Sequence, residues 1–330
     1  MNRSNVTNTL SKWHDFKLKI IFEGIAVGVF AGILAVCYRY LLQIAFHFSQ
    51  NIYSTQRADW RFIPVWLAVL LSGGWFTGWL VKKEPMISGS GIPQIKGILL
   101  QRLRMKWWRV VIWKFIGGIM CIGAGLSLGR EGPSIQMGAA AGQGISRLFR
   151  RIKLEEKYLI TCGASAGLAA AFNAPVAGVI FALEELHKNF SPLVAASALA
   201  ASLAADYISK GILGMRPVFD FRQISPIPLK EYALLVILGI LTGLLGALFN
   251  KTLLKTQKIY SMIKLPTEAK VAAAFLAAGA VGFFLPEILG GGHEMINKII
   301  MEQFPLKILA LFLAAKFLFT MASYGSSAPG

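Results

Sequence analysis

The sequence predicts an all-α, polytopic membrane protein: an inverted-repeat bundle of tilted and broken helices. Its composition is the first reason, because 55% of the 330 residues are hydrophobic and only 15% are charged. Soluble domains carry about 25% charged residues. The second reason is the length of the uncharged runs, since about 20 apolar residues cross a bilayer core as one helix. Residues 62–81, 158–183 and 232–250 contain no Asp, Glu, Lys or Arg, and a soluble fold with a buried core fits such runs poorly.

Eight apolar segments follow one another along the chain. They begin near Ile20, Phe62, Val110, Tyr158, Pro192, Tyr232, Val271 and Leu306. Residues 1–19 are polar and basic and are assigned to an N-terminal cytoplasmic segment. Residues 20–215 are expected to form a first membrane repeat, and residues 216–330 an incomplete second membrane repeat. The apolar stretch after residue 19 is too long and too rich in Gly for a cleavable signal peptide.

Three motifs with Gly or Pro interrupt the apolar segments where an unbroken spanning helix would avoid them. They are Ser88-Gly89-Ser90-Gly91-Ile92-Pro93, Gly129-Arg130-Glu131-Gly132-Pro133 and Asn173-Ala174-Pro175. Pro is tolerated in the first turn of a helix and disfavoured in its interior. Each motif therefore predicts a helix that begins in the middle of the apolar sequence.

A repeated order of short motifs indicates two homologous halves. The pairs are Gly24-Ile25-Ala26-Val27-Gly28 with Gly239-Ile240-Leu241-Thr242-Gly243, Gly89-Ser90-Gly91 with Gly290-Gly291-Gly292, and Lys114-Phe115 with Lys316-Phe317. Each match is weak alone because Gly is abundant, but the shared order and spacing support a repeat. Transporters built from such repeats place broken helices at mid-membrane, where the helix ends form the substrate site.

The net charge of +18 has a membrane explanation. Basic residues gather in the stretches 102–109 and 147–157, and such clusters are typical of cytoplasmic loops. No zinc-finger or RNA-binding motif accompanies them, so nucleic-acid binding is not expected.

Cys37, Cys121 and Cys162 stand alone in apolar segments, which predicts neither a metal site nor a disulfide framework. No cofactor is expected.

Most glycines are expected to serve helix packing, because small residues four apart let membrane helices approach closely. One such pair, Gly163 and Gly167, brackets Ser165 in the Gly-x-Ser-x-Gly pattern of a nucleophile elbow. A serine hydrolase needs a base, yet none of the four histidines lies in the middle of an apolar segment. They are His14, His47, His187 and His293. Packing therefore explains the pattern better than an intramembrane hydrolase, and no enzymatic activity is expected.

Two of the Gly- and Pro-containing motifs are suited to binding an anion. A helix N-terminus exposes unpaired N–H groups and about half a positive charge, so two ends aimed at one point can bind an anion. At the first motif, the Ser90 hydroxyl can donate a hydrogen bond and Gly91 permits close approach, while Pro93 starts the helix. At the second, Pro133 again lies just inside the start. A simple N-cap turn is the alternative explanation for Ser90.

Glu131 lies between the uncharged runs 117–129 and 132–146, which places it inside the membrane. Carboxylates are costly there and are functional by default. At a helix N-terminus an ionised Glu131 can occupy the anion site, and a protonated one can leave it. An ion pair with Arg130 or Lys114 is the alternative explanation.

Glu184 and Glu185 end the uncharged run 158–183 and precede His187 and Lys188. A solvated helix end at the membrane surface explains these carboxylates, and so does a proton path. The residues alone leave both explanations open.

At these residues the chain resembles the CLC family of chloride channels and proton-coupled chloride transporters. Three stretches carry the likeness: Gly89-Ser90-Gly91-Ile92-Pro93, Gly129-Arg130-Glu131-Gly132-Pro133, and residues 163–185 with Phe172-Asn173-Ala174-Pro175 inside them. The resemblance runs from about Glu23 to the end of the chain. It implies a homodimer in the cell (inner) membrane, with a separate pore in each subunit.

The resemblance also implies roles for single residues. Glu131 corresponds to the gate and the extracellular-side proton acceptor. Glu185 corresponds to the internal proton-transfer glutamate of the exchangers, which favours exchange over passive conduction. The implied anion-binding residues are Ser90, Gly91, Ile92, Glu131 and Gly132, supported by Pro93, Gly129, Arg130, Pro133 and Lys114.

Two departures from the family pattern bear on function. Gln94 and Lys96 stand where acidic residues are common in family exchangers. The chain also stops at Gly330, before the family's Gly-x-Phe-x-Pro motif and a later tyrosine that contacts chloride. The expected function is chloride/proton antiport, with chloride, protons and membrane lipid as partners. A passive voltage- or pH-gated chloride channel and a non-transporting fragment are the alternatives.

Overall fold

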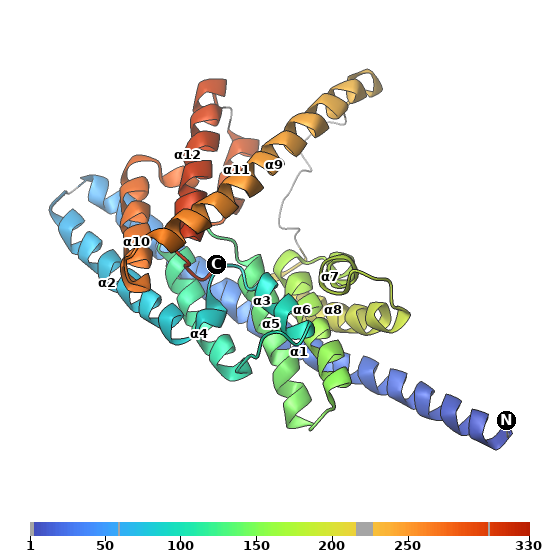
Figure 1. The fold of residues 1–330 in the computed structure, drawn as a ribbon. Coiled ribbons are helices and arrows are strands. Elements are labelled where there is room, and N and C mark those ends of the chain that lie inside the picture. The colour runs from blue at the N-terminus through green and yellow to red at the C-terminus, as the bar shows by residue number, and fades with distance from the viewer. Residues whose placement is uncertain (1–2, 59, 216–226, 303) are drawn as a thin grey trace.

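The computed structural model describes residues 3–58, 60–215, 227–302 and 304–330 (Figure 1). Within these ranges the regular structure is helical, apart from one isolated bridge between Gly89 and Pro329. The α-helices are α1 (Arg3–Ala58), α2 (Ile63–Lys83), α3 (Ile92–Leu99), α4 (Trp107–Gly123), α5 (Glu131–Leu148), α6 (Lys153–Phe172), α7 (Pro175–Phe181), α8 (Pro192–Leu213), α9 (Tyr232–Met262), α10 (Thr267–Phe284), α11 (His293–Met301) and α12 (Leu306–Gly325). The single-turn helices are η1 (Trp60–Phe62), η2 (Pro85–Ile87), η3 (Ala182–His187), η4 (Leu229–Glu231) and η5 (Pro286–Ile288). The all-α prediction is confirmed.

Six of the described helices are long and apolar enough to cross a membrane. They lie within α1, α2, α8, α9, α10 and α12. Helix α1 runs through the expected boundary at residues 19 and 20 without a break, and the boundary after residue 215 lies at the edge of the described residues. The division of the chain into residues 1–19, 20–215 and 216–330 stays a prediction.

The three expected mid-sequence helix starts are all present. Helix α3 begins at Ile92, α5 begins at Glu131 and α7 begins at Pro175. Pro occupies one of the first two positions of α3 and of α7, where its missing N–H breaks no helical hydrogen bond. Broken helices are therefore a property of this fold, and Figure 1 shows that the helices cross one another at steep angles.

The internal repeat is visible as two copies of one structural series. Helices α1 to α4 form the first copy, with η2 between α2 and α3. Helices α9 to α12 form the second, with η5 at the equivalent place between α10 and α11. Gly91 and Gly292 precede α3 and α11 with φ angles of 87° and 91°, in the left-handed region that favours glycine. Lys114 donates to the carbonyl oxygens of Ile87 and Gly89. Lys316 donates to those of Ile288 and Gly290 at 2.8 and 2.5 Å.

The two copies point in opposite directions. Helix α2 packs against its counterpart α10, with Gly74 close to Ala272 and Gly78 close to Glu268. The residue numbers rise along one helix as they fall along the other, so the two helices are antiparallel. Equivalent helices of opposite direction are what a two-fold axis in the membrane plane requires.

Close helix packing through glycine is also present as expected. Gly28 of α1 lies so near α8 that a Cβ atom would stand 2.2 Å from the carbonyl oxygen of Ala201. Gly138 of α5 and Gly163 of α6 face each other in the same way, each within 2.1 Å of the other's carbonyl oxygen when a Cβ is added. Such contacts let apolar helices associate by van der Waals packing in lipid.

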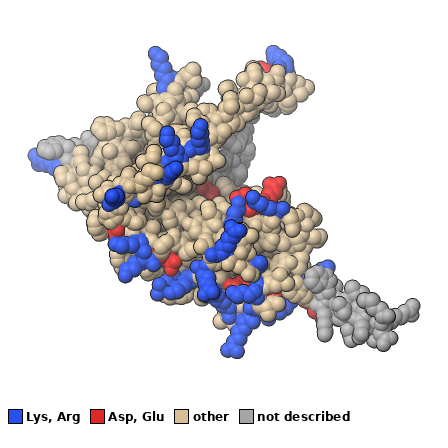
Figure 2. All heavy atoms as spheres, viewed as in Figure 1, with Lys and Arg blue, Asp and Glu red and all other residues tan. Residues whose placement is uncertain are grey.

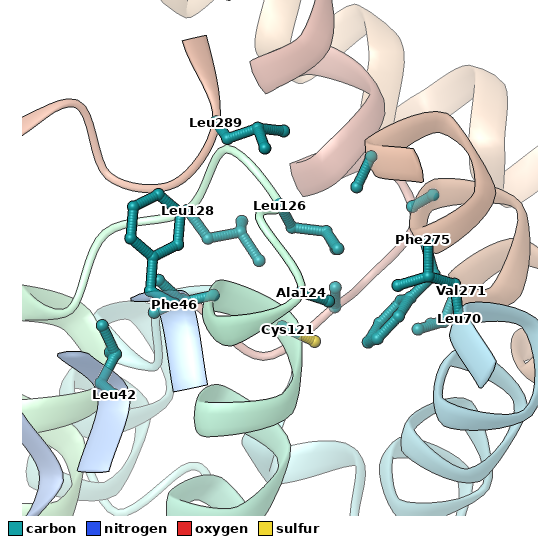
Figure 3. Close-up of a cluster of buried hydrophobic side chains, with 14 of the residues drawn as sticks. Leu42, Phe46, Leu70, Cys121, Ala124, Leu126, Leu128, Val271, Phe275 and Leu289 are labelled. Carbon is teal, nitrogen blue, oxygen red and sulfur yellow. The ribbon is translucent and has the colours of Figure 1, made fainter. Parts of the chain in front are cut away.

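One hydrophobic cluster joins the two halves (Figure 3). Leu126 and Leu128, from the connection between α4 and α5, lie with Leu289 above them and with Phe275 and Val271 of α10 to one side. The cluster therefore holds the segment before Glu131 against the second half of the molecule.

Helix α9 differs from the other spanning helices because none of its residues is buried. In Figure 1 it projects from the bundle, and Figure 2 shows that much of the surface beside it is uncharged. A helix that is apolar on all sides is stable only against lipid or another apolar surface, as expected of a membrane protein.

Candidate functional site: two helix N-termini and a glutamate between two cavities

The expected convergence of two helix N-termini is present. Helix α3 begins one residue after Gly91 and α5 begins at Glu131. A Cβ atom on Gly132 would stand 2.7 Å from the carbonyl oxygen and 3.0 Å from the Cβ of Ser90, so the two chain segments touch. The N–H groups and the positive dipole ends of both helices are thereby brought to one place.

The segment before Ser90 is held from two sides. Lys114, which is fully buried, donates to the carbonyl oxygens of Ile87, at 2.9 Å, and of Gly89. From α5, the Gln136 side chain donates to the carbonyl oxygen of Met86 at 2.6 Å. These donors satisfy three carbonyl oxygens that would otherwise repel an anion.

The Ser90 hydroxyl keeps a donor for a ligand. Its oxygen accepts from the Ile92 N–H at 3.4 Å, which leaves its own O–H group to donate. The hydroxyl and the helix-end amides together can bind a small anion without a full positive charge in contact with it.

Glu131 is the first residue of α5. Its carboxylate Oε1 lies 3.5 Å from Nε2 of His293, and the side chain is 24% exposed. Lys114 donates to two carbonyl oxygens, and the ion pair that the described residues show for Glu131 is the one with His293. Arg130 is buried directly before it and adds positive charge beside the carboxylate.

Two cavities lie on either side of the Ser90 and Glu131 region. The smaller, of about 80 Å³, is lined by Arg130, Gly292 and His293 among others. The larger, of about 540 Å³, is lined by Ser90, with Gln94, Tyr260, Lys270 and Tyr324 among others. The two cavities are lined by different residues, as expected of the two entrances of one pathway.

Contacts of α1 assign the cavities to membrane sides. Lys19 of α1 pairs with Glu155 at 2.7 Å, and Glu23 pairs with Arg151, so this part of α1 lies beside the basic stretch 147–157. Phe46, which lines the smaller cavity, is separated from Glu23 by roughly 35 Å of helix at about 1.5 Å per residue. With the basic stretch in the cytoplasm, the smaller cavity is the outer cavity.

Glu185 lies on the inner side, away from the Glu131 carboxylate. It belongs to η3, a single π-helical turn that continues α7, and π-turns are frequent at functional sites. Its side chain is 47% exposed and forms an ion pair with Lys96. Lys96 lies one turn along α3 from Ile92, so the pair connects Glu185 to the helix that begins just after Ser90.

The structure also bears on the hydrolase alternative. Ser165 is fully buried, and its hydroxyl shares a 2.8 Å hydrogen bond with the hydroxyl of Ser202. The flanking Gly163 and Gly167 contact the backbones of Gly138 and Ser134. The Gly-x-Ser-x-Gly pattern is therefore a packing feature.

His293 is the functional candidate that the sequence analysis missed. It was set aside because it lies outside the middle of an apolar segment, yet it contacts Glu131. The repeat contained the signal: Gly290-Gly291-Gly292 aligns with Gly89-Ser90-Gly91, so His293 follows at the start of a broken helix.

A family model described as "Voltage gated chloride channel" matches residues 73–330. The chain belongs to this CLC family. Two relatives are the H(+)/Cl(−) exchange transporters ClcA of Vibrio vulnificus (strain YJ016) and Salmonella agona (strain SL483). They are 32% and 34% identical over 330 and 332 residues, each match covers 95% of this chain, and the matches cover 69% and 68% of the relatives.

A solved structure gives the same result for the fold of this CLC-family chain. The slow cyanobacterial Cl−/H+ antiporter is 31% identical, with a TM-score of 0.88, and the match covers 94% of this chain and 74% of that one. The expected inverted-repeat fold is confirmed, and the protein is a multi-pass membrane protein of a transport family.

Proposed function

We propose that this CLC-family chain exchanges chloride for protons across a bacterial inner membrane, as a homodimer with one pathway in each chain. The observation that carries the proposal is the position of Glu131, at the N-terminus of α5, beside Ser90 and between two cavities. The relatives named as H(+)/Cl(−) exchange transporters support the same pair of ions, and so does the cyanobacterial antiporter.

Chloride binds in this proposal where the two helix ends meet. The Ser90 hydroxyl donates to the ion from the inner side, and the backbone amides of Ile92 and Gly132 face it from the two helix N-termini. Gly91 permits the approach of the chain, because its left-handed backbone and the nearby Gln136 side chain leave no room for a Cβ. Chloride reaches Ser90 through the larger, inner cavity.

Glu131 couples the two ions because its carboxylate and an anion compete for one place. An ionised carboxylate occupies the helix-end site and closes the outer route. Protonation removes the charge that holds it there, so the side chain leaves and chloride passes. Two negative charges within about 4 Å repel by several kcal/mol at the reduced dielectric of a protein, and this repulsion makes the two occupancies alternate.

Glu185 is the inner proton carrier of the proposal. It is half-exposed on the inner side and can exchange protons with the cytoplasm. A passive chloride channel is the second candidate function, and the observation that favours it is the ion pair of Glu185 with Lys96, which occupies the carboxylate that would carry the proton.

The test is proton movement driven by a chloride gradient in liposomes that contain the full chain. We expect protons to move against their own gradient in the wild-type protein. The variant Glu131→Gln should abolish this movement and keep chloride flux, because glutamine cannot exchange a proton. The matched control is Glu287→Gln, a glutamate that pairs with Lys298 at 3.5 Å and has no part in the pathway; it should stay coupled.

Chloride flux without proton movement in the wild-type protein would favour the channel. Continued proton coupling in Glu131→Gln would remove Glu131 from the mechanism.

A further inference from the structure

The contact between His293 and Glu131 joins the two halves of the molecule at the gate. His293 is the first residue of α11, in the second half, and Glu131 is the first residue of α5, in the first half. Their Nε2 and Oε1 atoms lie 3.5 Å apart. Both side chains are about equally exposed, at 23% and 24%, so solvent reaches the pair without separating it.

His293 connects Glu131 to the outer cavity. His293 and Arg130 line that cavity together with Glu294. Glu294, the next residue of α11, is 49% exposed and accepts a 2.7 Å hydrogen bond from Gln50 of α1. His293 therefore lines the outer cavity and also contacts the Glu131 carboxylate.

The charges around His293 come from several elements. Burial lowers the pKa of His293 to about 4, and so do the positive charges of Arg130 before α5, Arg39 of α1 and Lys316 of α12. The Glu131 carboxylate, 3.5 Å from the imidazole, opposes these cations. Passing the imidazolium proton to Glu131 therefore relieves repulsion by all three cations.

We propose that His293 is the outer-side proton carrier for Glu131, an inference that rests on the proposed exchange of chloride for protons. The imidazolium gives the proton on Nε2 to Oε1 of the ionised carboxylate. This breaks one N–H bond, forms one O–H bond, and leaves a neutral imidazole beside a neutral acid. The imidazole regains a proton from water in the outer cavity, and the neutral acid leaves the anion site.

The two halves of the repeat support a special role for this position. The equivalent residue of the first half is Ile92, which follows Gly91 as His293 follows Gly292. Both residues begin a broken helix directly after a glycine in the left-handed conformation. Ile92 shows that an apolar side chain is enough for packing at this position. The imidazole stands only where the helix start faces the Glu131 carboxylate.

The experiment measures exchange by the full chain in liposomes while the external pH is varied and the internal pH is fixed. The variant is His293→Gln, which keeps a hydrogen-bonding side chain and loses titration. A positioned proton carrier raises a rate by about 100-fold or more in a closed site. Because water enters the outer cavity and can replace part of this effect, we expect His293→Gln to lower the exchange rate by about tenfold. The rate should also lose the dependence on external pH that centres near pH 4, because burial and the nearby cations lower the pKa of His293 to about 4.

Two controls isolate the proton step. His47→Gln changes a 62% exposed histidine on the same face, whose nearest carboxylate is Glu294 at 3.9 Å; it should keep the wild-type rate and pH profile. The double variant Glu131→Gln with His293→Gln should conduct chloride as Glu131→Gln does, which establishes an intact pathway.

A wild-type external-pH profile in His293→Gln, with coupling intact, overturns the role of His293 and leaves the proposed function standing. A wild-type protein that moves no protons overturns both.

Discussion

Two lysines hold equivalent turns in the two halves of the molecule. Lys114 donates to the carbonyl oxygens of Ile87 and Gly89, and Lys316 to those of Ile288 and Gly290. A buried ammonium without acceptors is costly, and the carbonyl oxygens of these turns supply the acceptors. The sequence suggested Lys114 as an ion-pair partner of Glu131, because charge is visible in a sequence and the direction of a turn's carbonyl groups is not.

The ion pair of Lys96 with Glu185 predicts how fast the inner proton step runs. The pair is partly exposed, and exposed ion pairs contribute up to about 1 kcal/mol. That energy must be supplied each time the Glu185 side chain leaves Lys96 to exchange a proton. In Lys96→Met we therefore expect proton-coupled exchange to become faster by up to about fivefold, since about 1.4 kcal/mol corresponds to tenfold in rate. The measurement is the initial rate of chloride-driven proton movement at fixed external pH.

The matched control is Lys106→Met, which removes a cation from the connection between α3 and α4 and leaves the ion pair of Glu185 intact. An equal gain in both variants would assign the effect to net charge. A slower Lys96→Met variant would contradict the pair's inhibitory role and make Lys96 a part of the proton path.

At the scale of elements, local chemistry predicted the helix starts. The Gly and Pro motifs at α3, α5 and α7 act on the backbone within a few residues, and all three helices begin where the motifs place them. The π-turn η3 was not predicted, because a run such as 158–183 carries no signal for a change of helical pitch. The contact of His293 with Glu131 was missed since it depends on how α11 docks against α5, far away in sequence.

The interface of α5 with α6 yields a prediction of stability. A methyl group on Gly163 would stand 2.0 Å from the carbonyl oxygen of Gly138, so Gly163→Ala must push the two helices apart. Overpacking costs about 1–3 kcal/mol, and we expect a lower midpoint of thermal unfolding for this variant in detergent.

Gly246→Ala is the matched control, because nothing lies within 4 Å of a Cβ added to this glycine of α9. Alanine is the better helix former by about 1 kcal/mol, so the control should unfold at the same temperature or higher. A Gly163→Ala variant as stable as the control would mean that α5 and α6 can separate without loss.

At the scale of the whole molecule, the cluster in Figure 3 explains why the gate belongs to both halves. Leu126 and Leu128 fix the segment before Glu131 against Leu289 and α10. The same docking brings η5 and the start of α11 to the outer cavity, and Gly290 donates to the carbonyl oxygen of Gly125 at 2.9 Å. Because α3 and α11 belong to halves of opposite direction, Gly91 before α3 lies on the side of the inner cavity and Gly292 before α11 on the side of the outer cavity.

This inversion makes equivalent residues face opposite sides of the membrane. Gln101 follows α3 and Glu302 follows α11, at matching places in the repeat, and both are exposed. In a variant with Cys37 replaced by Ser, we expect Gln101→Cys to react with a membrane-impermeant maleimide only from the cytoplasmic side. Glu302→Cys should react only from the outer side, because α11 runs opposite to α3. Cys121 and Cys162 are buried and should stay unlabelled in both. Labelling of both positions from one side would mean parallel repeats, and the outer position of the cavity at His293 would then be wrong as well.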